Sequence, residues 1–351
     1  MLSNSPISSI VVIVNNVTAG TITANQTICY NGDPAAFTST GAGTAPVGAT
    51  ITYKWQSSAN NISFSDISGA TLAAYDPPSN LTATTYYRRI TVSTLNTIVC
   101  QSIPSNVITV TVQSVPTAGT IAASQTICNG GNPAAFTSSA DGTGAGTITY
   151  IWQSSLNNST FSDIASATAS TYDVPNGLTA TTYYRRITVS TLNGVACQSA
   201  ASNVLTVTVQ SVPTAGSIAA SQTICYNGDP AAFTSVAGTG NAGATITYIW
   251  QSSTDNNNFS TIASQNAATY DPPTGLSTTT YYQVVISSAL NGVTCTTISN
   301  ALTVIVNSVT AQTIAAGQTI CSGGDAVAFT VNTASIGAGN LSYQWQSASL
   351  A

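Results

Sequence analysis

Seven cysteines are the residues of this sequence whose type and spacing could do chemistry. Four end the repeated motif Gln-Thr-Ile-Cys: Cys29, Cys128, Cys225 and Cys321. The other three hold a second recurring place: Cys100, Cys197 and Cys295. Cysteines at regular places in a small β domain indicate disulfides and an oxidising compartment, with buried free thiols as the alternative.

The spacing between the two sets suggests how the cysteines pair. Each Cys of the first set precedes one of the second by 71, 69 and 70 residues (100 − 29, 197 − 128 and 295 − 225). We therefore predict three bonds inside repeats: Cys29–Cys100, Cys128–Cys197 and Cys225–Cys295. Each would close a loop worth about 4 kcal/mol in the chain-entropy model. Cys321 is unpaired in this segment, and its partner is expected beyond Ala351.

Other kinds of active site find little support in the sequence. The chain has no His, no Glu and one Lys, so Ser/His/Asp and Cys/His arrangements are unavailable. Asp33, Asp229 and Asp325 recur in turns, but Asn132 replaces them in the second repeat, which indicates turn chemistry rather than Ca²⁺ binding. We expect no enzyme, no metal and no cofactor.

The same period organises the whole chain. Four tryptophans follow it at steps of 97, 98 and 95 residues: Trp55, Trp152, Trp250 and Trp345. A period near 97 residues fits an independent domain rather than a solenoid repeat. The predicted domains are 18–114, 115–211 and 212–308, with 309–351 as the first half of a fourth repeat and 1–17 as the last strand of a preceding or partner repeat.

Charge is scarce in this chain. Only 4% of residues are charged and the net charge is −5, so a nucleic-acid partner is not expected. Ser, Thr, Asn and Gln take the place of charge, and we expect glycans or neighbouring copies to cover such a surface. The apolar run Ile10–Val14 is too short to span a membrane, and the start Met1–Pro6 has no basic signal region.

The coarse structure of one repeat can be read from its pattern. Residues 115–211 contain about seven short runs of strand formers separated by turn signals, and no helical period. The run Thr147–Gln153 alternates, which puts Trp152 on an apolar face; a core role for all four tryptophans is favoured over sugar stacking. We predict an all-β fold of tandem immunoglobulin-like β-sandwich domains, arranged as a rod because the linkers at Pro116 and Pro213 are short.

The repeated motifs also carry a resemblance. Gln-x-Ile-Cys-x-Gly-x-x-Ala-x-Phe, Tyr-x-Trp-Gln-Ser-Ser, Thr-Thr-Tyr-Tyr-Arg-Arg and Ser-Asn-x-(Ile/Leu)-Thr-Val together resemble the Ig-like and PKD-like tandem repeats of large secreted surface proteins of Bacteroidota. This resemblance implies adhesins, surface filaments or stalks. Ordinary immunoglobulin domains join their two sheets beside the Trp, whereas here Cys128 and Cys197 are expected to staple one end of the sandwich.

Three further sets of residues have structural and binding interpretations. In each Tyr pair (Tyr86-Tyr87, Tyr183-Tyr184, Tyr281-Tyr282) one ring should be core and the other exposed, where it could bind glycans or a neighbour. The pairs Arg88-Arg89 and Arg185-Arg186 become Gln283-Val284, which favours structural pairing with Asp66 or Asp163. Candidate glycosylation sites at similar places after each Trp are Asn61, Asn158 and Asn258.

Together these features predict a secreted or cell-surface structural protein that forms or spaces a fibre. Its partners would be copies of itself or further repeats, with strand completion by residues 10–14 of another copy as one means of assembly. The alternative is an adhesin that binds glycans or a solid surface through its repeated modules.

Overall fold

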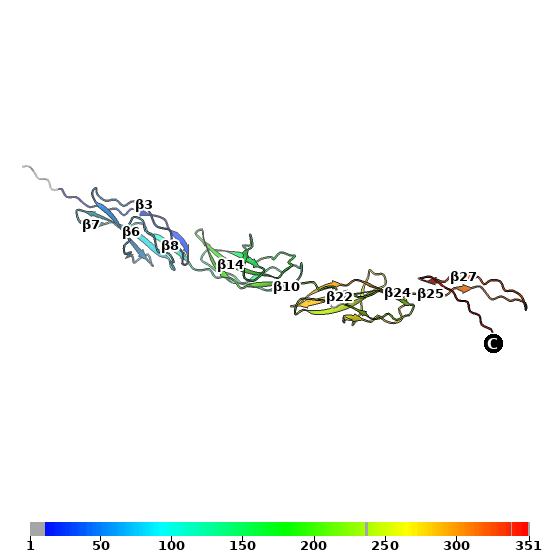
Figure 1. Cartoon of the computed structure of the whole chain (residues 1–351). Helices are drawn as coiled ribbons and strands as arrows, with labels where there is room; N and C mark the ends of the chain where they lie inside the picture. Colours follow the sequence, from blue (N-terminus) through cyan, green and yellow to red (C-terminus); the bar gives the residue numbers. More distant parts are fainter. Residues whose placement is uncertain (1–10, 236–237, 338, 350–351) are drawn as a thin grey trace, which may run out of the picture. The chain divides into compact units, whose positions relative to one another are not determined.

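The computed structural model describes residues 11–235, 238–337 and 339–349. Over these residues the chain forms strands and loops and no helix, so no helix that could cross a bilayer is found there (Figure 1). The chain divides into two compact units. The first comprises the residues up to Ser124 with Ala134–Val174 and Thr182–Thr206; the second comprises Gln125–Pro133, Pro175–Thr181 and the residues from Val207 onward.

The first repeat lies entirely in the first unit. Its strands are β1 (Thr21–Ile22), β2 (Gln26–Cys29), β3 (Ser39–Gly41), β4 (Thr50–Ser58), β5 (Ser65–Asp66), β6 (Thr85–Leu95), β7 (Ile98–Gln101) and β8 (Ile108–Gln113). One sheet has the order β2-β8-β6-β4-β5, with β7 also on β6, and β1 pairs with β3 in a second, smaller layer. This is the predicted sandwich, with one sheet much larger than the other.

The register of the large sheet sets where the cysteines lie. β2 runs parallel to β8, with Cys29 opposite Gln113. β8 is antiparallel to the beginning of β6, with Thr85 opposite Val110. β7 is antiparallel to the end of β6, with Ser93 opposite Cys100. The two cysteines of a repeat therefore lie toward opposite ends of its long central strand.

Alternation along β4 and β6 builds the core of the first repeat. The fully buried Trp55 stacks on Phe37 at 5.8 Å between ring centroids, and Tyr87 packs on the same ring. The indole Nε1 of Trp55 donates to the carbonyl of Leu72 at 3.0 Å, which satisfies its one polar group. Ile22, Ile108 and Val110 close the cluster.

The second repeat has the same elements. They are β9 (Thr120–Ala122), β10 (Gln125–Cys128), β11 (Thr137–Ala140), β12 (Thr147–Ser155), β13 (Ser162–Asp163), β14 (Thr182–Leu192), β15 (Val195–Ala201) and β16 (Leu205–Gln210). In the first unit, β12 pairs with β13 and β14, β14 with β15, and β9 with β11. In the second unit, β10 runs parallel to β16 with Cys128 opposite Gln210.

The third repeat lies in the second unit. Its strands are β17 (Gln222–Cys225), β18 (Phe233–Thr234), β19 (Thr245–Ser253), β20 (Ser260–Thr261), β21 (Thr269–Tyr270), β22 (Thr280–Leu290), β23 (Val293–Ile298) and β24 (Leu302–Asn307). The sheet order β17-β24-β22-β19-β20 repeats that of the first domain. Trp250 is fully buried among Phe233, Tyr282 and Val304.

Residues 309–349 differ from the three repeats. Where the structure describes this range, its strands are β25 (Val309–Thr310), β26 (Thr313–Ile314), β27 (Val331–Thr333) and β28 (Ile336–Gly337), paired as β25-β28 and β26-β27. Trp345 is 61% exposed, so its predicted core role is wrong. The reason is that Trp250 is covered by residues of β22 and β24, and no counterpart of either strand occurs among the described residues after β28.

Candidate functional site: the joint between neighbouring repeats

The cysteines meet at the junctions between repeats. We call the ends of β2 and β8, with Thr27, Cys29 and Gln113, the trailing end of the first repeat. We call the β14–β15 hairpin the leading end of the second repeat. Both ends lie within the first compact unit, and the equivalent ends of the second and third repeats lie within the second unit.

Two disulfides join a trailing end to the next leading end. Cys29 bonds Cys197 with the Cα atoms 5.6 Å apart, and Cys128 bonds Cys295 with the Cα atoms 5.7 Å apart. Cys100, Cys225 and Cys321 are free thiols. The predicted pairs Cys29–Cys100, Cys128–Cys197 and Cys225–Cys295 are therefore wrong. The bonds run between repeats, and they do not staple the end of one sandwich.

Strand register explains why a bond inside a repeat cannot form. Cys29 lies beyond the Thr85 end of β6, whereas Cys100 is opposite Ser93 near the other end. The eight residues between Thr85 and Ser93 (93 − 85) span roughly 26 Å at about 3.3 Å per residue. A disulfide needs Cα atoms within about 7 Å. Only the next repeat brings a cysteine close enough to the trailing end.

Hydrogen bonds accompany the first disulfide. The amide of Asn193, in the hairpin turn, donates to Thr27 Oγ1 at 3.0 Å. Gln113, 1% exposed, donates from Nε2 to the carbonyl of Val195 at 3.0 Å. Ser190 Oγ donates to Gln113 Oε1 at 3.5 Å. The trailing end of the first repeat is thus held to the leading end of the second by one disulfide and by hydrogen bonds between uncharged side chains and backbone.

The second joint repeats these contacts one period later. Asn291 donates to Thr126 Oγ1 at 3.1 Å, the counterpart of Asn193 on Thr27. Gln210, fully buried, donates from Nε2 to the carbonyl of Ser288 at 2.6 Å and to its Oγ at 2.9 Å. Asn193 and Asn291 share a left-handed backbone with φ of 50° and 49°, each followed by Gly as a tight hairpin turn requires.

The leading end of the first repeat is already engaged by the segment that precedes it. Ser93 Oγ donates to Asn15 Oδ1 at 2.7 Å, and Asn15 Nδ2 donates to the carbonyls of Ser93 and Ile98, each at 3.3 Å. Ser93 and Ile98 are the counterparts of Ser190 and Val195. Asn15 therefore contacts the first repeat as Gln113 contacts the second.

The arginine pairs are structural, but they do not meet the aspartates directly. Arg88 donates from Nε to Gln56 Oε1 at 2.7 Å, and Gln56 Nε2 donates to Asp66 at 2.7 Å. Asp66 forms its ion pair with Lys54 at 3.2 Å. The expected Arg–Asp pairing is corrected to a Gln-mediated one, and Gln153 bridges Arg185 to Asp163 in the same way.

The second arginine of each pair is buried. Arg186 is fully buried over Tyr150, with 4.2 Å between its guanidinium carbon and the ring centroid, and donates to Ser138 Oγ and to the carbonyl of Ser170. Burial lowers the pKa of this guanidinium. Its Nε has no hydrogen-bond partner. Val284, also fully buried, occupies this place in the third repeat.

The Tyr pairs and two of the candidate glycosylation sites occupy recurring positions in the repeats. Tyr87, Tyr184 and Tyr282 are buried, and the preceding Tyr of each pair is half-buried. Asn61 and Asn158 are exposed at equal turn positions with φ of 58° and 56°, but Asn256, with φ of 59°, is their counterpart in the third repeat. Asn258 is the residue expected at a similar place in the third repeat, but the residue at the equal turn position there is Asn256.

Asn258 lies two residues further along that turn. Its side chain donates to Asp255 Oδ2 at 2.6 Å. The backbone N–H of Asn258, with the Ser253 hydroxyl, holds the pKa of Asp255 well below its usual range.

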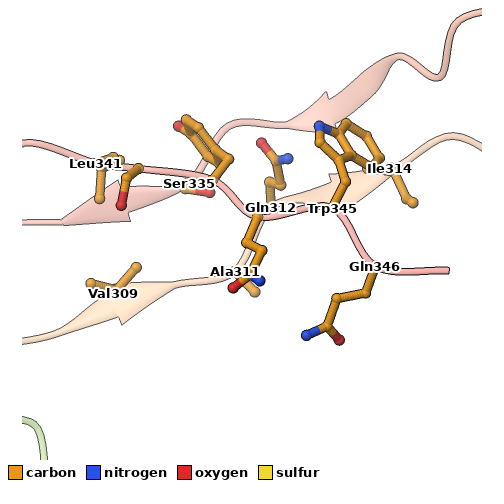
Figure 2. Close-up of a pocket in the computed structure, with 11 residues that line it drawn as sticks. Val309, Ala311, Gln312, Ile314, Ser335, Leu341, Trp345 and Gln346 are labelled. Carbon is orange, nitrogen blue, oxygen red and sulfur yellow. The ribbon is translucent and has the colours of Figure 1, made fainter.

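An open hollow of about 410 Å³ lies on residues 309–346. Figure 2 shows Ile314 and Trp345 at one end of it and Val309 and Leu341 at the other. Phe329 stacks on Trp345 at 6.1 Å, as Phe233 does on Trp250 at 6.0 Å. The hollow is thus the uncovered counterpart of a repeat core. No cluster of metal-ligating side chains occurs in the part of the chain that the structure describes.

Comparison with solved structures finds tandem-domain proteins at low identity. Titin domains I67–I69, in an E-to-A mutated variant, share 9% identity with a TM-score of 0.40, covering 84% of this chain and 99% of that one. Three N-terminal domains of the outer capsid protein Hoc of bacteriophage RB49 share 11% with a TM-score of 0.36, covering 83% and 99%. Extracellular domains 3–5 of Drosophila OTK share 14% with a TM-score of 0.30, covering 83% and 97%. No curated protein sequence matches the chain.

A family model matches the chain three times. It is described as a domain of unknown function, DUF8696, and it covers residues 18–114, 117–211 and 214–308. These three ranges correspond to the three complete sandwiches, and the two disulfides join one matched domain to the next. The chain belongs to the DUF8696 family, of which it carries three tandem domains.

Proposed function

We propose that the chain is an extracellular structural protein that spaces or builds a cell-surface fibre and that bears tension along its array. The observation that carries this proposal is that the two inter-repeat disulfides interleave in sequence: Cys29–Cys197 encloses Cys128, and Cys128–Cys295 encloses Cys197. Disulfides persist in oxidising compartments, which supports a secreted or surface location.

Interleaving shortens the covalent path through the array. Without disulfides, 266 residues separate Cys29 from Cys295 (295 − 29). With both disulfides formed, the shortest covalent path crosses from Cys29 to Cys197, follows the backbone back to Cys128, and crosses the second disulfide to Cys295. That path holds only 69 residues (197 − 128). Unfolded repeats would therefore release little length, as a load-bearing spacer requires.

The same bonds keep the array in one piece. A single backbone cut anywhere between Cys29 and Cys295 leaves both fragments joined by at least one disulfide. The Lys and Arg residues that a trypsin-like protease recognises in the sequence all lie inside this span: Lys54, Arg88, Arg89, Arg185 and Arg186. Of these, Arg89 and Arg186 are also buried. A surface fibre exposed to proteases would benefit from this redundancy.

The adhesin alternative has less support from the geometry. Trp55, Trp152 and Trp250 are fully buried and cannot stack on a sugar. Exposed turns at Asn61 and Asn158 remain candidates to carry glycans, which would suit a surface with little charge.

Strand completion would be an added means of assembly. Val12 and Val14, 81% and 74% exposed, are the sequence counterparts of Val304 and Val306 in β24. If Val12 and Val14 entered the open hollow of another copy, they would supply a counterpart of β24 there but no counterpart of β22. Trp345 would then be covered only in part.

Single-molecule pulling of the full chain by its ends tests the proposed function. Reduction of the disulfides should lengthen the fully stretched chain by 197 residues (266 − 69), roughly 670 Å at about 3.4 Å per residue. The variant with both Cys29→Ser and Cys128→Ser is the matched control and should show the long value without reductant. Equal stretched lengths in oxidised and reduced wild-type protein would contradict the proposal.

A further inference from the structure

The linker that enters the second repeat is bound to that repeat at two consecutive residues. The N–H of Thr117 donates to the carbonyl oxygen of Thr143 at 2.8 Å, and the N–H of Thr143 donates back to Thr117 Oγ1 at 2.8 Å. The two threonine hydroxyls share a further hydrogen bond of 2.8 Å. Thr188 Oγ1 donates to the carbonyl oxygen of Ala118 at 3.0 Å. We call these contacts of Thr117 and Ala118 with Thr143 and Thr188 the linker clamp.

The two other repeats are entered in the same way. Thr18 pairs with Thr44 in the first repeat, and Thr214 pairs with Thr239 in the third, through the same reciprocal hydrogen bonds. Ile286 replaces Thr188 in the third repeat, so the side chain there cannot donate to the linker. The threonine pair is therefore the recurring part of the contact.

Two glycines allow the linker clamp to close. Gly119 has a left-handed backbone with φ of 67°, and a Cβ at this position would collide with the carbonyl oxygen of Ala140. A Cβ on Gly142 would collide with Thr188 Oγ1 and would lie 2.6 Å from the carbonyl oxygen of Thr117. The linker and the facing loop can approach this closely because both positions lack a side chain.

The linker clamp lies only a few residues from the trailing end of the first repeat. β8 ends at Gln113, which is opposite Cys29. From Gln113 to Thr117 there are four steps along the chain (117 − 113), and Pro116 between them is buried. Four steps span at most roughly 14 Å at about 3.4 Å per residue. Cys29 therefore stays close to the second repeat as long as the linker clamp is closed.

The ends that form the joints do not themselves determine which cysteines pair. The trailing ends of the first and second repeats both carry Gln-Thr-Ile-Cys, and the leading ends of the second and third both carry an Asn-Gly turn. They also meet through the same hydrogen bond from Asn to Thr. If the ends alone decided, Cys29 could bond Cys295 as well as Cys197.

We propose that the linker clamp docks the first repeat on the second before any disulfide forms, and that this docking selects Cys197 as the partner of Cys29. Docking holds the two thiols at a high effective concentration, whereas a cysteine of a more distant repeat must be brought in by diffusion of the chain. The contacts of Thr214 and Thr239 do the same for the second joint. The inference goes beyond the proposed function, because it concerns how the joints are made.

Forming the bond needs an oxidant, which is a disulfide carrier such as oxidised glutathione. The Cys29 thiolate attacks the carrier disulfide, forms a mixed disulfide and releases one carrier thiolate. The Cys197 thiolate then attacks the Cys29 sulfur and releases the other carrier thiolate. Two protein thiols become one disulfide, and the two carrier thiolates take up the two protons. The linker clamp acts on the second step, because it brings Cys197 to the mixed disulfide.

Hydrogen exchange in the chain without disulfides tests the docking. The N–H groups of Thr117 and Thr143 both donate within the linker clamp. In the full chain with Cys29→Ser and Cys128→Ser, both should exchange at least about 10-fold more slowly than in an unstructured peptide. Exchange at the unstructured rate, while the N–H groups of β12 stay protected, would overturn the proposal, since docking would then need the disulfide.

Gly119→Ala tests the selection of the partner in a glutathione redox buffer. The added Cβ should open the linker clamp, so the equilibrium constant for forming Cys29–Cys197 should fall on the order of 10-fold or more. Peptide mapping should then find Cys29 bonded to the carrier or to another cysteine. Cys128–Cys295 should be unchanged, because its own linker is intact.

Gly177→Ala is the matched control in the same repeat. Gly177 also has a left-handed backbone, with φ of 81°, but a Cβ there would have no atom within 4 Å. This variant carries the same kind of backbone strain without the collision, and it should leave both disulfides unchanged. Equal formation of Cys29–Cys197 in Gly119→Ala and Gly177→Ala would contradict the proposal.

A second variant decides the question if Gly119→Ala unfolds the repeat, which loss of exchange protection along β12 would reveal. Thr117→Val combined with Thr188→Val removes the three side-chain hydrogen bonds of the linker clamp with little change in shape. The equilibrium constant for Cys29–Cys197 should again fall about 10-fold, and an unchanged constant would overturn the proposal. Neither result alters the stretched lengths of the wild-type chain on which the proposed function depends.

Discussion

Gln210 and Ser288 are joined by two buried hydrogen bonds across the joint between the second and third repeats. Gln210 Nε2 donates to the carbonyl oxygen of Ser288 at 2.6 Å and to its hydroxyl oxygen at 2.9 Å, and both residues are fully buried. The disulfide Cys128–Cys295 lies on the neighbouring strands, because Cys128 is opposite Gln210 and Cys295 is opposite Ser288. The hydrogen bonds and the disulfide therefore support one another.

Replacing this glutamine should weaken the adjacent disulfide. Gln210→Ala removes both buried hydrogen bonds to Ser288, at a cost of about 1–2 kcal/mol. The equilibrium constant for forming Cys128–Cys295 in a glutathione buffer should fall by about 5- to 30-fold. Quantitative peptide mapping of Cys128–Cys295 and Cys29–Cys197 in the same sample measures this equilibrium constant.

The molecule supplies two controls for that measurement. Cys29–Cys197 in the same variant should be unaffected, since its own contact is made by Gln113. Gln198→Ala, at an exposed position on β15, should change neither disulfide. An equal fall in both bonds would indicate general destabilisation and would argue against a local coupling.

Arg186→Val should be tolerated although it removes a buried charge. Val284 holds the equivalent place, and there Ser235 Oγ donates to the carbonyl of Ala268 at 2.7 Å. With Arg186 present, Ser138 Oγ already lies 3.5 Å from the carbonyl oxygen of Ser170, so it can donate to that carbonyl in the same way. Because a buried cation with an unpaired N–H carries a desolvation cost, the free energy of unfolding should stay unchanged or rise by up to about 2 kcal/mol.

Arg186→Ala is the contrasting variant at the same position. It removes the charge but leaves a cavity between Tyr150 and Trp152, so the free energy of unfolding should fall by about 2–4 kcal/mol. Calorimetric unfolding of the full chain measures both variants. A large loss of stability in Arg186→Val would show that the arginine itself is required.

The buried tyrosines predict an alkaline limit to stability. Burial raises the pKa of Tyr87, Tyr184 and Tyr282 to about 12. In the unfolded chain a tyrosine titrates near 10, so the folded state holds the proton more tightly. The contribution of these protonated tyrosines to the free energy of unfolding is fully present below about pH 10 and is lost as the pH rises toward 12.

The three tyrosines can be tested one at a time. Tyr282→Phe should remove one buried hydroxyl from the titration seen by ultraviolet absorbance, and it should flatten the decline in stability between about pH 10 and 12. Stability that does not change over this range in the wild-type protein would contradict the inferred burial of these hydroxyls.

The repeats and their strands could be predicted from the sequence because they depend on local signals. Alternation around Trp152, the Asn193-Gly194 turn and the period of the tryptophans all have a direct structural meaning. The exposure of Trp345 could not be derived in that way. Burial of a residue depends on strands that come later in the chain, and no counterpart of β22 or β24 occurs among the described residues after Trp345.

The pairing of the cysteines shows a different limit. In a tandem array any pairing rule gives a constant spacing: 71, 69 and 70 residues inside repeats, and 168 and 167 between them. Spacing therefore cannot choose between the two rules. The deciding fact is that Cys29 and Cys100 lie at opposite ends of β6, which depends on the parallel pairing of β2 with β8. The contacts of Gln113 and Gln210 with the next repeat could not be predicted from the sequence either, because they also depend on how one repeat meets the next.

The central claim is that covalent bonds join neighbouring repeats, and disulfide mapping tests it most directly. The monomeric chain, denatured with its free thiols blocked and then digested with pepsin without reduction, should yield linked peptides containing Cys29 with Cys197 and Cys128 with Cys295. Cys100, Cys225 and Cys321 should carry the blocking group. Linked peptides containing Cys29 with Cys100, or Cys128 with Cys197, would contradict the account.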